Sequence, residues 1–141
     1  MTRISLLLLS SAFAVGCASP QPSSSPAGVE PLLASAMLKA ARQEGSVSLV
    51  LVSPEVSEGI LDALERHVAV NRVNSSSAAG LGKGRLLLQR SVVGETEAAL
   101  IGRLGPVPTG PGHLSCGTGL TVTFKKVGSE WQQGDLQILQ C

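Results

Sequence analysis

The sequence predicts an α+β domain in which two helices pack on a mostly antiparallel sheet whose last strands form a meander. Two observations indicate this fold class. The first half of the chain carries two segments, residues 31–44 and 54–66, whose apolar side chains recur with the helical period. The second half, from residue 85 onward, consists of apolar or alternating segments separated by Gly, Pro and Ser, which is typical of antiparallel strands.

The first helix is expected over residues 31–44. Pro31 suits the first turn of a helix, and Gly45 is a typical residue just after the last turn. Residues 47–52 are apolar at nearly every position, so we expect a strand covered on both faces. The second helix is expected to begin after Ser53, a favoured N-cap residue that precedes Pro54, and to run to about residue 66.

The second helix carries three acidic residues on one side, Glu58, Asp62 and Glu65. They could form a catalytic or metal-binding carboxylate site, but acids at this spacing are typical of a solvated helix face, here with Arg66 four residues after Asp62. His67 follows at the edge of the apolar stripe. We expect a partly buried structural histidine there rather than a general base, because no partner motif accompanies it.

The remaining elements follow from the apolar pattern and the turn residues. Residues 68–73 are expected to form a short strand and residues 74–84 a loop. Lys83 lies among glycines in that loop, but the segment does not match a phosphate-binding loop because Gly84 stands where Ser or Thr is required. Further strands are expected over residues 85–93, 97–104, 118–127 and 131–139, the last two forming a hairpin.

The first residues of the chain have the composition of a secretory signal peptide. Arg3 provides a positive charge, residues 4–15 are apolar, and Gly16 offers a small residue at a cleavage point. The apolar stretch is too short for a membrane-spanning helix. An ordinary signal peptide, cut just before Cys17, is one interpretation of this stretch.

The run Ala14-Val15-Gly16-Cys17 resembles the lipobox of bacterial lipoproteins. The resemblance implies that residues 1–16 are removed and that Cys17 carries the lipid, which would anchor the chain to a membrane. Ala18 stands where an Asp signals inner-membrane retention in enterobacterial lipoproteins, so the resemblance favours the outer membrane, facing the periplasm. The implied organisation is a signal peptide over 1–16, a Ser/Pro-rich tether over 17–29 and a single α+β domain over 30–141.

Lipidation of Cys17 would leave two cysteines, Cys116 and Cys141. In a compartment beyond the inner membrane we expect them to form one disulfide, which would link the residues flanking the last hairpin. A zinc site that combines these cysteines with His113 and Asp135 is the alternative, but it lacks a second ligand pair of the usual spacing. A catalytic pair of Cys116 and His113 would need a free thiol.

Composition narrows the classes of partner. The chain has 11 basic and 10 acidic residues, and removal of Arg3 with the leader would leave ten of each. A neutral chain with scattered charges has no basic surface for nucleic acid or anionic lipid, so we expect the lipid alone to attach it to the membrane. Only Phe124 and Trp131 would remain as aromatic residues, and core packing is the simplest role for both.

These patterns predict a lipid-anchored cell-envelope protein with a non-catalytic binding or accessory domain, no cofactor and no metal. An envelope protein is the expected partner. The candidate partner loop is the Pro/Gly segment with Pro106, Pro108 and Pro111, although such a segment could also only route the chain between strands. The alternatives are a small inhibitor or immunity-type protein, and an envelope enzyme that uses His67 or His113.

Overall fold

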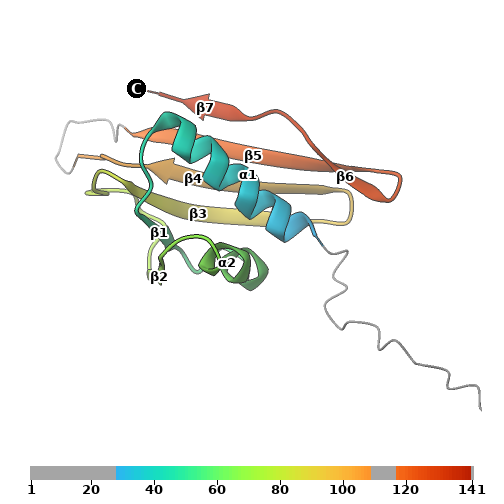
Figure 1. Ribbon diagram of the computed structural model, residues 1–141, viewed down its shortest axis with the longest axis horizontal. Coiled ribbons are helices and arrows are strands. Elements are labelled where there is room, and N and C mark those ends of the chain that lie inside the picture. The colour runs from blue at the N-terminus through green and yellow to red at the C-terminus, as the bar shows by residue number, and fades with distance from the viewer. Residues whose placement is uncertain (1–27, 109–116, 141) are drawn as a thin grey trace, which may run out of the picture.

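The computed structural model describes residues 28–108 and 117–140 of the chain (Figure 1). Within these ranges it contains two helices and seven strands: α1 (Val29–Glu44), β1 (Leu49–Val52), α2 (Glu58–Glu65), β2 (Val70–Arg72), β3 (Arg85–Val93), β4 (Glu97–Leu104), β5 (Thr118–Val127), β6 (Glu130–Gln133) and β7 (Gln137–Leu139). The predicted α+β class with two helices is confirmed. Cys116 and Cys141 lie outside the described residues, so the disulfide stays a prediction.

All seven strands belong to one sheet with the order β2-β1-β3-β4-β5-β6. The strand β7 pairs with β5 on the same side as β6, nearer the start of β5. The two pairings of β1, with β2 and with β3, are parallel, and every other pairing is antiparallel. The mostly antiparallel sheet and the meander from β3 to β6 therefore agree with the sequence prediction.

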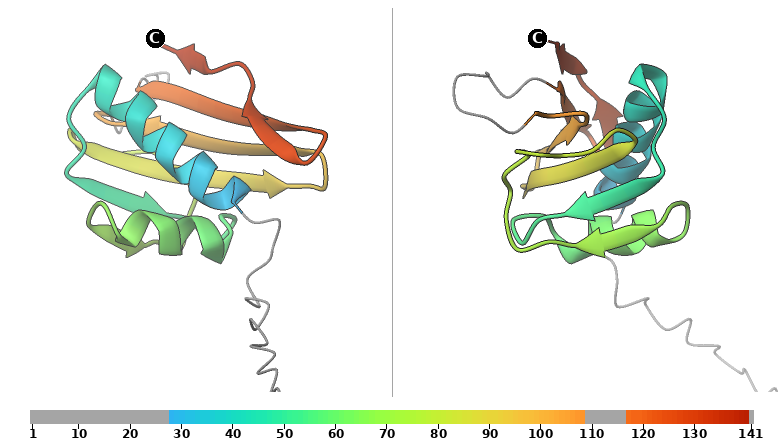
Figure 2. Two further views of the ribbon diagram at one scale, coloured as in Figure 1. Left: turned by 45° about the vertical axis from the view of Figure 1, so that its right-hand side comes forward. Right: turned by 90° about the vertical axis from the view of Figure 1, so that its left-hand side faces the viewer.

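Both helices lie on the same face of the sheet (Figures 1 and 2). The main core fills the space between them and the sheet, with Leu33 and Met37 of α1 fully buried above Leu100 and Val122 of the sheet. Gly102 of β4 allows this close packing, because a Cβ there would lie only 3.3 Å from the sulfur of Met37. Burial of Phe124 and partial burial of Trp131 against this core confirm their predicted packing role.

A second, smaller cluster covers the opposite face of the sheet. It consists of Ala78 and Leu81 from the loop after β2, Leu87 of β3 and Val107, with Leu51 of β1 packed against it. Since Val50 and Val52 face the main core, β1 is covered on both faces, as its apolar sequence predicts.

Two elements differ from the sequence prediction. The helix α2 begins at Glu58 rather than after Ser53, because the chain first makes a short turn in which the Ser53 hydroxyl accepts from the N–H of Glu55. The same buried hydroxyl donates to the backbone carbonyl of Gln89 at 2.6 Å. The Ser53 side chain thus ties the chain to β3 instead of capping a helix. The segment 131–139 is divided into β6 and β7, and Gly134 between them donates its N–H to the carbonyl of Thr123.

Candidate functional site

The two helices are joined at their N-terminal ends. The carboxylate of Glu30, in the first turn of α1, accepts a hydrogen bond from the hydroxyl of Ser57 at 3.1 Å. Ser57 is the N-cap residue of α2, and its hydroxyl makes no capping bond to its own helix. The same carboxylate fills the space above Gly59, where a side chain would overlap it. Glu30 thereby places negative charge at the N-terminus of α2, where the helix dipole favours it.

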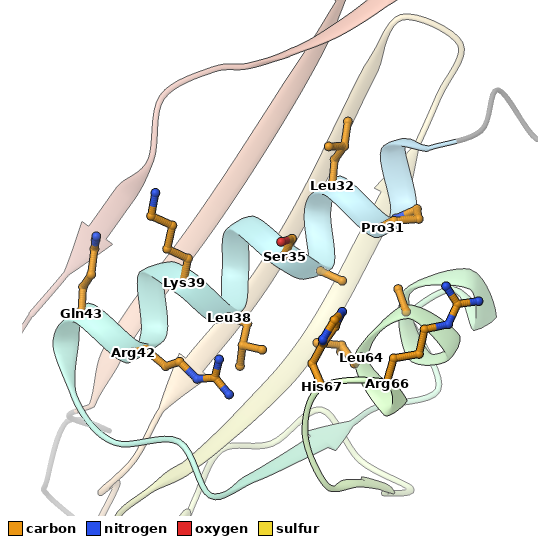
Figure 3. Close-up of a pocket in the computed structure, with 12 residues that line it drawn as sticks. Pro31, Leu32, Ser35, Leu38, Lys39, Arg42, Gln43, Leu64, Arg66 and His67 are labelled. Carbon is orange, nitrogen blue, oxygen red and sulfur yellow. The ribbon is translucent and has the colours of Figure 1, made fainter.

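Beyond this junction, a groove of about 750 Å³ lies between α1 and the C-terminal end of α2 (Figure 3). Its twelve lining residues come from both helices and from the turn after α2. Leu38, Arg42 and His67 extend into the space between the helices, whereas Leu32, Lys39 and Gln43 extend from the other side of α1 (Figure 3). The groove is open to solvent along its length.

The lining is cationic. Lys39, Arg42 and Arg66 contribute three positive charges, and no Asp or Glu lines the groove. All three side chains are exposed, and none forms an ion pair with another residue of the described part of the chain. Basic side chains gathered without acidic neighbours create a local positive potential that attracts anions.

The acidic residues of α2 lie apart from this groove. Glu58 forms an ion pair with Arg72 of β2, and both side chains are largely exposed. The hydrogen bond from Arg72 lowers the pKa of Glu58 below its ordinary value, and the same bond raises the pKa of Arg72. Asp62 and Glu65 are exposed as well, so the predicted solvated face is confirmed. The ion pair on this helix joins Glu58 to Arg72 of β2.

The predicted site residues are distributed as follows. His67 is exposed in the groove, which corrects the expectation of partial burial: it lies two residues beyond the end of α2, in the turn that follows the helix. Cys17, His113, Cys116 and Cys141 lie outside the described residues, and so does Pro111. Asp135 is exposed. Over 28–108 and 117–140, no group of three or more His, Cys, Asp or Glu side chains could hold a metal ion.

The described part of the predicted partner loop packs against the sheet. Val107 is 3% exposed in the second apolar cluster and donates its N–H to the carbonyl of Leu81 at 2.7 Å. Pro106 and Pro108, on either side of it, are exposed. This arrangement favours a structural role for residues 105–108.

A second hollow of about 520 Å³ lies over β3, β4 and β5, with Val92, Ala99 and Thr123 among its lining residues. Lys125 at its rim pairs with Glu97, and Asp135 also lines it, so its charged residues are two acids and one base. Sequence reasoning missed the cationic groove because its basic residues are 24 or more positions apart between the helices. The signal that could have found it is the pair of Lys39 and Arg42 on the polar side of the first helix, together with Arg66 at the end of the second.

No protein-family model, no curated protein and no solved structure matches the chain. Within the described residues, neither α1 nor α2 has the length and apolar character needed to cross a membrane. The interpretation of the groove therefore rests on its own residues.

Proposed function

We propose that the chain is a lipid-anchored protein of the bacterial cell envelope whose domain binds an anionic partner in the groove between α1 and α2. The lipid on Cys17 holds it in the outer membrane on the periplasmic side, as the lipobox-like leader implies. The observation that carries the binding role is that Arg42 extends into the groove, Lys39 and Arg66 lie beside it, and no carboxylate lines it. In a chain of nearly balanced charge, three basic side chains at one groove are a local excess of positive charge.

A titration with simple anions tests this binding role. Inorganic phosphate and a short poly-glutamate peptide are added to the mature protein while its backbone amide resonances are followed by NMR. Shifts are expected at Ser35, Arg42 and His67, and they should disappear in the Arg42→Glu variant. The matched control is Arg90→Glu, on the opposite face of the sheet, which should leave the shifts intact. Equal shifts over the whole domain, or none in the groove, would refute an anion-binding groove.

An envelope enzyme is the second candidate, because His67 is exposed in the same groove. An enzyme of this kind predicts that His67→Ala abolishes an activity while the melting temperature stays unchanged. An inhibitor or immunity-type protein instead predicts a tight stoichiometric complex that depends on Arg42 and Arg66. An enzyme would bind a substrate in the groove and an inhibitor would bind one target protein there, so the identity of the bound molecule distinguishes these alternatives from the main proposal.

A further inference from the structure

The occupant of the cationic groove can be inferred from where the chain is anchored. The sequence predicts attachment by the lipid alone, but the basic residues at the groove alter this expectation, and we propose that the groove and the outer side of α1 dock on the anionic phospholipid headgroups of the membrane that holds the lipid. This inference rests on the proposed function, because it uses the same anchor and groove and names their partner. The domain would then lie on the bilayer with its helices toward the lipid and the opposite face of the sheet turned away.

The first argument is the length of chain between the anchor and the groove. Only eleven residues, 18–28, separate Cys17 from the start of α1 at Val29. Fully extended, they span at most about 40 Å at roughly 3.5 Å per residue. The end of α1 that follows them carries Pro31 and Leu32, which line one end of the groove. An anchored domain therefore keeps this groove within reach of the bilayer at all times.

The second argument is the chemistry of the outer side of α1. Leu32 is 41% exposed near the start of the helix, and Lys39 follows two turns later on the same side (Figure 3). An exposed apolar residue can contact the acyl boundary of a membrane while basic residues beside it contact anionic headgroups. The acidic side chain of Glu58 is held at the far edge of the sheet by Arg72 of β2. Anionic lipid would repel Glu58, and this repulsion would favour the orientation in which the groove faces the bilayer.

The magnitude of the attraction suits a tethered domain. One Lys or Arg close to an anionic membrane increases binding about fivefold. The three cations of the groove would together contribute about a hundredfold, which is too little to hold a free protein on a membrane. A short tether, however, makes the contact intramolecular at an effective concentration on the order of millimolar. A contact of that strength at such a concentration is formed for part of the time, so the anchored domain would dock reversibly without any protein partner.

Chemical footprinting of the anchored protein tests the inference. The protein extracted from native membranes is placed in vesicles of phosphatidylcholine alone or of phosphatidylcholine with phosphatidylglycerol. Acetylation then reports the exposure of Lys39, and modification by phenylglyoxal reports that of Arg42. Lys83, in the loop before β3, and Arg90, on the opposite face of the sheet, are equally exposed controls.

Docking predicts that modification of Lys39 and Arg42 slows by up to about twofold in the anionic vesicles, because the docked state is populated for part of the time. The protection should be absent in neutral vesicles and should be lost at high salt. The controls should not change, and in the Lys39→Gln/Arg42→Gln variant the nearby Arg66 should lose its protection. A Lys83→Gln/Arg90→Gln variant should keep the protection of Arg66.

Equal reactivity in both kinds of vesicle would overturn the inference, and so would protection of the controls. Protection that depends on protein concentration in neutral vesicles would also overturn it, because a second copy of the chain would then cover the groove. If soluble anions still bind the groove and the chain still carries its lipid, the docking alone fails and the proposed function stands. If the extracted chain carries no lipid, or no anion binds the groove, the proposed function fails as well.

Discussion

The carboxylate of Glu30 accepts a hydrogen bond from the hydroxyl of Ser57 at 3.1 Å and so joins the N-terminal ends of the two helices. This contact adds to the packing of α1 and α2 through the main core, and the groove lies beyond it. The geometry of the groove therefore depends in part on a residue that does not line it.

A double-mutant cycle tests the junction of the helices. Replacing Gly59 by Ala should stabilise α2 by roughly 0.5–1 kcal/mol on propensity alone. In the wild-type chain the new methyl group overlaps the carboxylate of Glu30, so we expect the gain to be cancelled. In the Glu30→Ala background the gain should reappear. Urea unfolding of the four proteins measures the coupling, and an identical effect of Gly59→Ala in both backgrounds would show that the contact is unimportant.

The main core should depend on Leu100, which is completely buried between the sheet and the helices. Leu100→Ala is expected to lower the free energy of unfolding by about 2–5 kcal/mol, through lost apolar burial and the cavity left behind. Leu32→Ala is the matched control, and because Leu32 is 41% exposed its effect should be smaller, at most about 1 kcal/mol. Thermal or urea unfolding compares the two variants. Similar losses in both would contradict the assignment of the core.

The fold and the site differ in how far the sequence predicts them. The strand β5 alternates cleanly, and Leu120, Val122 and Phe124 are buried as that pattern predicts. The parallel pairing of β1 with β2 and β3 could not be predicted, because the apolar run of β1 indicates burial but not the neighbours or their direction. Long-range pairing is set by packing of the whole sheet rather than by local pattern.

The start of α2 and the groove were missed for the same kind of reason. Ser53 matches a helix cap locally, but its hydroxyl bonds a carbonyl of β3 that lies 36 residues away in the chain. The cations of the groove come from separate helices, so their meeting depends on how the helices pack. Local signals therefore located the elements, while contacts between distant segments decided their ends and the surface they share.

The role of Ser53 leads to a prediction of its own. Ser53 is 2% exposed, and its hydroxyl donates to the carbonyl of Gln89 at 2.6 Å. Ser53→Ala should cost about 1–2 kcal/mol of stability, because the carbonyl loses its partner in a buried setting. Ser57→Ala, which removes the hydroxyl at the true helix start, should leave the bond to β3 intact. Urea unfolding measures the loss, and a neutral Ser53→Ala variant would contradict a structural role for this bond.

The ion pair of Glu58 and Arg72 predicts a pH dependence. The hydrogen bond from Arg72 lowers the pKa of Glu58 in the folded protein, so this contribution to stability is complete above the unfolded pKa of about 4.3. It is lost as the pH falls through the lower, folded pKa. Arg72→Gln should return the pKa of Glu58 toward its ordinary value, as an NMR titration of the Glu58 side chain would show. An unchanged pKa would mean that the pair does not persist in solution.

The most direct test of the account is the intact mass of the protein extracted from native membranes, measured with and without reductant and thiol alkylation. We predict a chain that begins at Cys17, carries added acyl mass and takes up two alkyl groups only after reduction, at Cys116 and Cys141. That result would establish the lipid anchor and the disulfide together. A chain without lipid, or thiols that react before reduction, would contradict the account and would reopen Cys116 and His113 as a metal or nucleophile site.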